Sequence, residues 1–424
     1  MESLADGETI VTPTRRLAYY LKERWNEACL AGGLRVWRTP DILTWDALIE
    51  RSFVHDRQAG RLHARWLPVS TARLKWQRIV RADGETLAVL AKDGLGAAAY
   101  RSWQRLHDYL IPVSALDETD TAEAAALRRW IHRYRRWLDA GNWLDPSQAP
   151  ALLSSESLPG SLRMFGFDSM TPAQEAFLTR MQDARVDIRK SRGHARQGRC
   201  IKVTLDDERE EIDAAARWAA HRLQERPGDR LALVVPGLRE RRQDVRRALN
   251  AVLEPGSTLT GGSSAPSGLF ELAAAAPLSS VALVADAFEV LTAFIGGDDD
   301  AGAERMLEVR YCRGFEQEAL ARAGLDARRL SRGQRSLSPQ QLESLAERYD
   351  CAELAAALQA GSQKIGNWSE KVLPSIWAKR FFELLDSVGW PGEALDSPEH
   401  QARQRWQALL ADFGATEEVT GDLS

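Results

Sequence analysis

The stretch Leu-Arg-Met-Phe-Gly-Phe-Asp-Ser-Met-Thr-Pro-Ala-Gln, residues 162–174, joins a strand to a helix. Its first six residues are mostly apolar and predict a buried strand. Thr171 suits an N-cap and Pro172 suits the first helical position, so a helix is predicted over the following residues to Met181. A further short strand is predicted at 186–188. This strand–helix–strand order is typical of a parallel α/β sheet.

The N-terminal region shows the same order. Residues 9–12 (Thr-Ile-Val-Thr) predict a short strand, and Thr14 is placed to cap a helix whose apolar residues recur at helical spacing. A second extended stretch is expected at 34–37. The next helix is expected to begin at Asp41 or Thr44. The region therefore predicts a second piece of the same α/β sheet.

A long stretch between these two pieces is rich in Ala, Leu, Arg and Trp. Residues from about 60 to 150 show helical spacing, broken at prolines and glycines, and no strand-like alternation. Nine of the 14 tryptophans of the chain fall in the first 143 residues. Trp can stack on nucleic-acid bases, but in a helical protein it more often fills the core. We therefore predict a helical insertion.

A second α/β unit is predicted after the polar stretch 191–199, whose glycines and charges are typical of a linker. Its expected elements are a strand at 201–205, a helix at 207–223, a strand at 231–235 and a helix at 239–252. From about residue 281 the sequence again predicts helices only.

Length and composition exclude several classes of protein. The chain has 424 residues, of which 44% are hydrophobic and 27% charged, which is typical of a globular protein of two to four domains. No apolar run is long enough for a membrane span, and the N-terminus does not resemble a signal peptide. The four cysteines are far apart, which favours reduced thiols over a metal site or disulfides. We expect a cytoplasmic protein with no membrane partner.

Charge is distributed unevenly along the chain. The net charge of −4 is the sum of +6 over residues 1–200 (30 Lys and Arg, 24 Asp and Glu) and −10 over residues 201–424 (26 and 36). A basic front half predicts that any contact with nucleic acid lies there. The excess is modest for a DNA-binding protein.

Three segments resemble motifs of a known family, and the second α/β unit fits this family as well. Thr12–Ala18 (TPTRRLA), Arg38–Trp45 (RTPDILTW) and Phe165–Gln174 (FGFDSMTPAQ) resemble motifs of superfamily 1 helicases of the UvrD/AddB type. The third is the most specific and looks like the AddB form of the Walker B region. Asp207–Ile212 (DEREEI), with Leu233–Pro236 (LVVP) further on, resembles the start of the second RecA-like domain in these proteins.

The resemblance implies an α/β fold of RecA-like (P-loop NTPase-like) parallel-sheet domains with large all-helical insertions. The implied domains are a degenerate first RecA-like domain at 1–55 and 158–195, a helical insertion at 56–157, the start of a second RecA-like domain at 196–290, and a second helical insertion at 291–424. On this interpretation the chain stops before the second domain is finished.

Departures from the family pattern bear on activity. The sequence has no G-x-x-x-x-G-K-[ST] phosphate loop, and the strand before Gly166 lacks the Walker B acidic pair, with Asp168 displaced. ATP hydrolysis is therefore not expected, and neither are a cofactor, a metal or a catalytic residue within this chain. The chain resembles bacterial AddB-related DNA-repair proteins with degenerate helicase domains. Their PD-(D/E)xK exonuclease domain would lie beyond Ser424.

The resemblance also places a DNA path along the first two motifs. It implies that phosphate contact and base stacking hold the strand there. The residues implied are Thr14, Arg15, Arg16, Arg38 and Trp45. For Arg15 and Arg16 the alternative is a solvated start of a helix.

A basic helix with interleaved aromatic residues is predicted at 128–137. Its aromatic residues share one face, while arginines, among them Arg129 and Arg133, spread over the others. The helix is either a core helix with an exposed basic side or a phosphate-binding face. The acidic cluster at 206–211 is better explained by favourable charge at a helix N-terminus than by metal binding, because no His or Cys is near it.

Two functions follow as hypotheses. The first is a catalytically silent, helicase-like scaffold that binds single-stranded or end-containing DNA, within an AddB-like protein of double-strand-break repair or recombination. The second is a protein-interaction scaffold that docks a helicase or nuclease partner subunit without touching DNA. Salt-sensitive DNA binding distinguishes them.

Overall fold

The computed structural model describes residues 8–83, 92–119, 121–191, 198, 200–255, 269–272, 277–296, 302–366, 368, 371–392 and 395–421. These residues are mainly helical and include a four-stranded parallel sheet, so the α/β class is confirmed at this coarse level. None of the described helices combines the length and the apolar character needed to cross a membrane.

The chain forms two compact units. The first comprises Met1–Arg196, Glu370–Ala378 and Leu410–Ser424, and the second comprises Gln197–Ser369 and Lys379–Leu409. Most of the linker expected at 191–199 lies outside the described residues.

The sheet of the first unit has the strand order β2-β1-β5-β6, all parallel. The strands are β1 (Thr9–Thr12), β2 (Ile42–Thr44), β5 (Ser161–Phe165) and β6 (Asp187–Ser191). Three of the predicted strands form within a few residues of their expected positions. The extended stretch predicted at 34–37 is wrong as a strand. Val36 is 88% exposed and does not pack on the core. Ile42, by contrast, is buried and pairs with Ile10 of β1.

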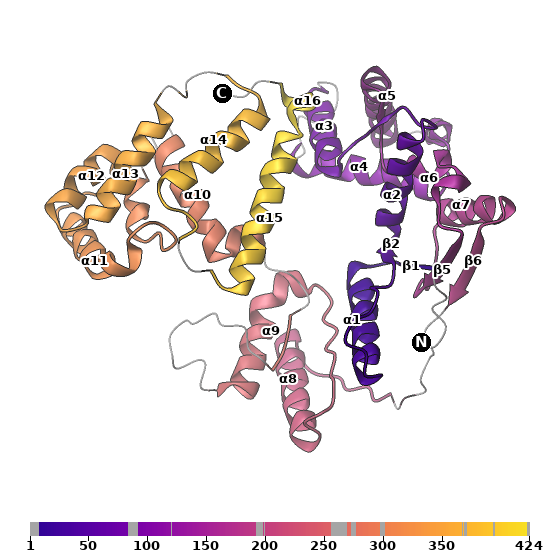
Figure 1. Ribbon diagram of the computed structural model, residues 1–424, viewed down its shortest axis with the longest axis horizontal. Helices are drawn as coiled ribbons and strands as arrows, with labels where there is room; N and C mark the ends of the chain where they lie inside the picture. Colours follow the sequence, from indigo (N-terminus) through magenta and orange to yellow (C-terminus); the bar gives the residue numbers. More distant parts are fainter. Residues whose placement is uncertain are drawn as a thin grey trace. The chain divides into compact units, whose positions relative to one another are not determined.

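Helices cover both faces of this sheet. α1 (Arg15–Ala31) packs on one face against Ile10, while α2 (Trp45–Gln58) and α7 (Pro172–Asp183) pack on the other around Val11. Neighbouring residues of a strand point to opposite faces, which is why Ile10 and Val11 serve different layers. Figure 1 shows β5 and β6 side by side, with α7 next to them.

Threonines cap the three helices, as the sequence predicts for Thr14 and Thr171. The Thr14 hydroxyl accepts a hydrogen bond from the Leu17 N–H (3.2 Å), and Thr171 forms a reciprocal capping box with Gln174. Thr44, rather than Asp41, caps α2. The Asp41 carboxylate instead accepts a hydrogen bond from the Thr9 hydroxyl at 2.5 Å.

The helical insertion has a core of its own. Its main helices are α3 (Val69–Arg81), α4 (Lys92–Asp108) and α5 (Ala122–Gly141). Shorter turns follow at η1 (Val113–Asp117), α6 (Ala149–Leu152) and η2 (Ser155–Ser157). Trp76, Trp103 and Trp130 are buried between the main helices, with the Tyr134 ring 4.8 Å from that of Trp76. The core role predicted for tryptophan is confirmed for these three residues.

A short parallel ladder closes the base of the insertion. β3 (Arg65–Trp66) pairs with β4 (Trp143–Leu144), and the Arg65 N–H donates to the Asn142 carbonyl at 2.7 Å. Asn142 adopts the left-handed conformation that ends α5. The prediction of helices only in this region is wrong for these four residues, because a two-residue ladder leaves no periodic signal in a sequence.

The C-terminal segment of the first unit packs on the insertion. α16 (Glu417–Thr420) lies against α3, and the Glu418 carboxylate pairs with Arg65 at 2.7 Å. Arg78 of α3 donates to the Val419 carbonyl. Residues distant in sequence thus belong to one compact body.

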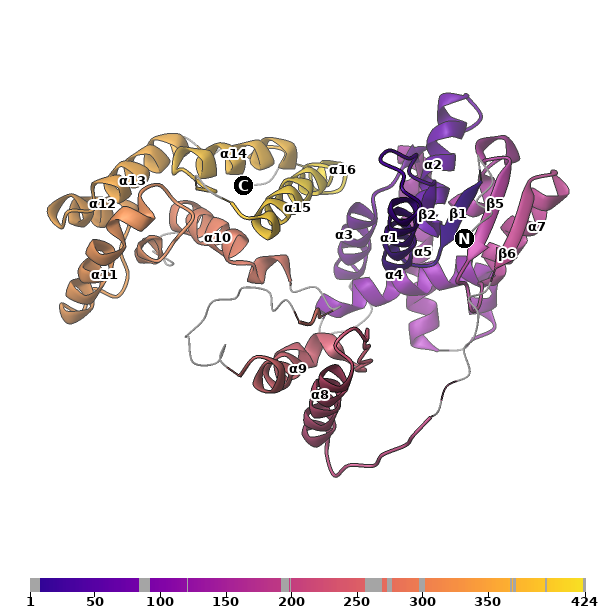
Figure 2. The same cartoon turned by 60° about the horizontal axis from the view of Figure 1, so that its bottom comes forward.

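The second unit contains helices and irregular segments, and none of its described residues belongs to a β-strand. Its longer helices are α8 (Glu208–Glu225), α9 (Leu238–Leu253), α10 (Ala282–Ile295), α11 (Phe315–Ser331), α12 (Pro339–Arg348) and α13 (Ala352–Ile365), with α14 (Pro374–Ser387) and α15 (Ser397–Gly414) shared between the units. Short turns form η4 (Leu278–Ser280) and η6 (Ala303–Leu307). Figure 2 shows α11, α12 and α13 gathered together.

The strands predicted at 201–205 and 231–235 are wrong, whereas the helices predicted after them form. Leu233 and Val235 rest against α8 and α9, but Val234 between them is 92% exposed. Neither segment makes a backbone ladder with any described residue. A strand requires a partner for its N–H and C=O groups, and these two segments lack one in the part of the chain described.

Candidate nucleic-acid interface

The carboxyl edge of the sheet is the position that the topology favours for a ligand. The chain passes from β1 through α1 to β2 on one side, and then returns to β5 on the other side of β1. The helices after β1 and β5, α1 and α7, lie on opposite faces. In open α/β sheets this change of direction marks where ligands bind, outside the carboxyl ends of the two strands.

The two loops at this edge touch each other. Gly166, directly after β5, has a φ of +77°. A Cβ atom there would lie 2.5 Å from Cδ2 of Leu17, in the first turns of α1, and 4.0 Å from Cδ of Pro13. Only glycine combines this backbone conformation with so close an approach. The glycine therefore fixes the β5 loop against the start of α1.

The loop after β1 is held by its threonines. Thr12 is fully buried, and its hydroxyl lies 3.1 Å from the carbonyls of both Thr14 and Leu43. The Thr14 hydroxyl is engaged in capping α1. Thr14 thus positions the start of the helix, and any ligand there would meet the backbone N–H groups of the first turn.

Arg15 and Arg16 form the first turn of α1, and both are exposed. That turn contains no acidic residue. The Arg15 side chain makes no hydrogen bond or ion pair with any residue that the structure describes. The N-terminus of a helix carries a partial positive charge from its free N–H groups, so this end combines two sources of attraction for an anion.

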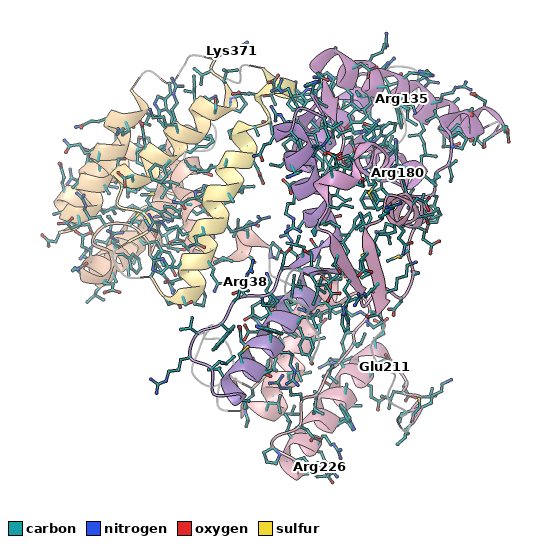
Figure 3. All side chains as sticks on the ribbon, turned by 45° about the vertical axis from the view of Figure 1, so that its right-hand side comes forward. Arg38, Arg135, Arg180, Glu211, Arg226 and Lys371 are labelled. Atoms are coloured by element: carbon teal, nitrogen blue, oxygen red, sulfur yellow. The ribbon has the colours of Figure 1, made fainter. Side chains whose placement is uncertain are left out.

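The surroundings of Arg38 and of Trp45 differ from those of Arg15 and Arg16 at the start of α1. Arg38, labelled in Figure 3, is exposed on the connection that enters β2 from its amino end. Arg15 instead follows the carboxyl end of β1. Trp45 is half-buried at the start of α2, and its ring meets that of Phe177 edge-on at 5.4 Å. The structure gives Trp45 a place in the core beneath the sheet and does not bring Arg38 together with Arg15.

Arg129 and Arg133 surround a buried carboxylate. Asp83 is only 1% exposed, and the Trp130 indole N–H donates to it at 2.6 Å. A nitrogen of Arg129 lies 3.2 Å from this carboxylate and one of Arg133 lies 3.5 Å away. Burying an unpaired charge is costly, so the two arginines neutralise Asp83. No sequence signal pointed to Asp83.

Acidic residues do not form a metal site among the described residues, where no group of three or more potential ligands comes together. The Asp207 carboxylate caps α8 by accepting a hydrogen bond from the Glu210 N–H at 2.8 Å. Glu210 in turn accepts one from the Asp206 N–H. The prediction that this acidic cluster serves a helix N-terminus is confirmed.

The thiols are not paired with each other. Cys29, Cys312 and Cys351 are buried, and Cys200 is exposed. Burial raises the pKa of Cys312 to about 12, so this thiol stays protonated at neutral pH.

Comparison with protein-family models and curated proteins adds no relative to this picture. No protein-family model and no curated protein matches the chain. The resemblance to UvrD/AddB-type helicases therefore stays a prediction that rests on the motifs quoted above.

Proposed function

We propose that the first unit is a catalytically silent, helicase-like scaffold that holds single-stranded DNA at the carboxyl edge of its sheet. The protein would act in DNA double-strand-break repair or recombination, as its AddB-like motifs suggest. The observation that supports this proposal best is the basic start of α1. Arg15 and Arg16 are exposed there without an acidic neighbour in the turn, at the topological switch between β1 and β5.

The chemistry of such a site is backbone recognition. Guanidinium groups and free helix N–H groups bind phosphate oxygens, which positions a strand without reading its sequence. Gly166 and Thr12 would serve it by fixing the two loops. We do not assign base stacking to Trp45, because its ring packs on Phe177. Arg129 and Arg133 are assigned to Asp83 instead of DNA.

The test separates DNA binding from folding. Arg15→Glu with Arg16→Glu places two carboxylates in the first turn of a helix, where they favour the helix but repel phosphate. We expect unchanged or slightly higher thermal stability and a clear loss of affinity for a fluorescein-labelled single strand, measured by anisotropy across a salt series. The slope of log K against log salt should become shallower by roughly 0.7 for each phosphate that the protein no longer neutralises.

Arg246→Glu with Arg247→Glu on α9 is the matched control. It changes net charge equally on an exposed helix of the second unit. Equal loss of affinity in both double variants would show a nonspecific charge effect. Absence of binding at low salt would overturn the proposal for this chain and leave the docking scaffold as the better hypothesis.

A further inference from the structure

A groove of about 340 Å³ lies in the first unit, where α4 and α5 of the insertion meet α6 and α7. Most of its surface is apolar, with Leu106, Val113 and Phe177 among the lining residues. Three side chains that carry or can carry positive charge also line it, namely His107, Arg135 and Arg180. No acidic residue lines it in the part of the chain that the structure describes. The groove thus combines a mainly apolar lining with cationic side chains.

The apolar surface extends beyond the groove itself. Tyr109 and Leu110 are each 57% exposed, Ile111 is 43% exposed and Leu152 is 54% exposed. Leu110 and Ile111 line the groove, and the other two adjoin lining residues in sequence. Contiguous exposed apolar side chains inside a polar rim are typical of a protein-binding surface. These exposed apolar side chains cover a larger surface than a small ligand held in the groove would contact.

Leu110 has an unfavourable backbone conformation. Its φ is +53°, the left-handed conformation that glycine adopts readily and a leucine disfavours. Leu110 lies two residues after the end of α4, where the Ile111 N–H donates to the Leu106 carbonyl at 2.8 Å. Glycine is the usual residue at such a position. The Leu110 side chain is largely exposed, so its burial contributes little to the stability of the fold. Stability therefore does not explain why this position carries a leucine instead of a glycine.

Arg135 and Arg180, which both line the groove, make different contacts. The Arg180 guanidinium donates to the carbonyls of Pro150, Ala151 and Leu153, and so ties α7 to α6. Arg135 is exposed, lies 5.6 Å from the centre of the Trp103 ring, and has no acidic partner among the residues described. Figure 3 labels both arginines. Arg135 is therefore available to a carboxylate from outside.

We propose that this groove docks a short acidic segment of a partner protein. A bulky apolar side chain of that segment would enter beside Leu110, and a neighbouring Asp or Glu would pair with Arg135. Buried apolar anchors supply most of the energy of such interfaces, and the arginine supplies specificity. The proposal goes beyond DNA binding and does not depend on it, because no residue of α1 lines the groove.

The experiment starts from a displayed library of random octapeptides, selected on the full chain and counter-selected on the Leu110→Gly variant. We expect enrichment of sequences that combine Asp or Glu with Leu, Phe or Trp. Affinities of synthesised peptides are then measured by fluorescence anisotropy. Leu110→Gly should weaken binding about tenfold or more, the effect of removing a leucine side chain that is buried in an interface. Circular dichroism should show no loss of thermal stability in this variant.

Charge variants give the second arm of the test. Arg135→Glu should weaken binding by a similar factor, whereas Arg136→Glu, its exposed neighbour on α5, should not. Leu320→Ala, at an 87% exposed leucine of α11, controls for loss of an apolar side chain. The proposal is overturned if no sequence is enriched, if the enriched sequences lack carboxylates, or if Leu110→Gly and Arg135→Glu leave binding unchanged.

Discussion

Asp56 and Ser154 are joined by two hydrogen bonds across 98 residues of sequence. The Ser154 N–H donates to Oδ2 of Asp56 at 2.8 Å and its hydroxyl donates to Oδ1 at 2.6 Å. The Nε of Arg61 donates to the same carboxylate at 2.6 Å. Asp56 lies near the end of α2, and Ser154 shortly precedes β5. This one carboxylate thus holds the beginning and the end of the insertion together.

Asp56→Asn should destabilise the protein in a pH-dependent way. Burial alone would raise the pKa of Asp56, but the hydrogen bonds from Ser154 and Arg61 hold this pKa below its ordinary value. A lowered pKa stabilises the fold above the unfolded pKa, and this contribution is lost as pH falls through the folded pKa. We expect Asp56→Asn to lower the free energy of unfolding by about 1–3 kcal/mol at pH 7.

Urea unfolding at pH 7 and at pH 3 checks this expectation. The difference between wild type and variant should shrink at the lower pH. Glu156→Gln is the control, because Glu156 pairs with Arg61 from an exposed position and should cost little. A difference that stays constant with pH would show that charge on Asp56 is not the cause.

Gly166→Ala should be more harmful than alanine at another glycine of similar φ. Gly33 has a φ of +78° with nothing within 4 Å of the added Cβ, whereas at Gly166 the Cβ would meet Leu17 at 2.5 Å. The Gly33→Ala variant reports the backbone strain alone, about 1–2 kcal/mol. Gly166→Ala should exceed it in chemical unfolding, and Leu17→Ala should restore part of the excess. Equal losses would mean that the two loops are not in contact.

Arg129→Gln with Arg133→Gln should lower stability and leave DNA binding unchanged. Both arginines neutralise the buried carboxylate of Asp83, so their removal leaves a poorly compensated charge. A loss of about 1–3 kcal/mol is expected, reduced because the arginines are themselves partly exposed. Arg128→Gln, whose partner Asp117 is exposed, is the control. Weaker DNA binding with unchanged stability would instead make this helix a phosphate-binding face.

The pair Glu318 and Arg322 should show strong coupling in the second unit. Arg322 is 1% exposed and donates to the Glu318 carboxylate at 3.0 Å. That carboxylate also accepts the Glu353 N–H at 2.6 Å at the start of α13. Arg322→Met should cost about 3–5 kcal/mol, because it leaves a buried carboxylate without its cation. In a double-mutant cycle with Glu318→Gln, the double variant should lose less stability than the two single variants together. Simple additivity would contradict this.

The sequence predicts the local structure of the first unit well, because local patterns decide it. Thr14 and Thr171 are good caps with helical spacing behind them, and both cap helices. The alternation of Ile10 and Val11 places helices on both faces of the sheet. Strands that depend on distant partners are less predictable. The residues at 231–235 have the right composition for a strand but pair with nothing described.

The candidate site shows the same limit. Arg15 and Arg16 follow from a local motif, and the structure places them at the topological switch. Arg129 and Trp45 are indistinguishable from ligand-binding residues in a linear sequence. Their partners Asp83 and Phe177 lie 46 and 132 positions away and are brought to them only by the fold. DNA binding itself stays a prediction.

The ladder between β3 and β4, together with the hydrogen bonds between Asp56 and Ser154, has a consequence for the evolution of this chain. The sheet requires only that the two ends of the insertion lie close together, and two residue pairs and one carboxylate hold them there. Because closing a longer loop costs little additional entropy, the segment between them can be lengthened, trimmed or exchanged as a single block. Natural variation is therefore expected to replace this module as a whole while strand register is preserved.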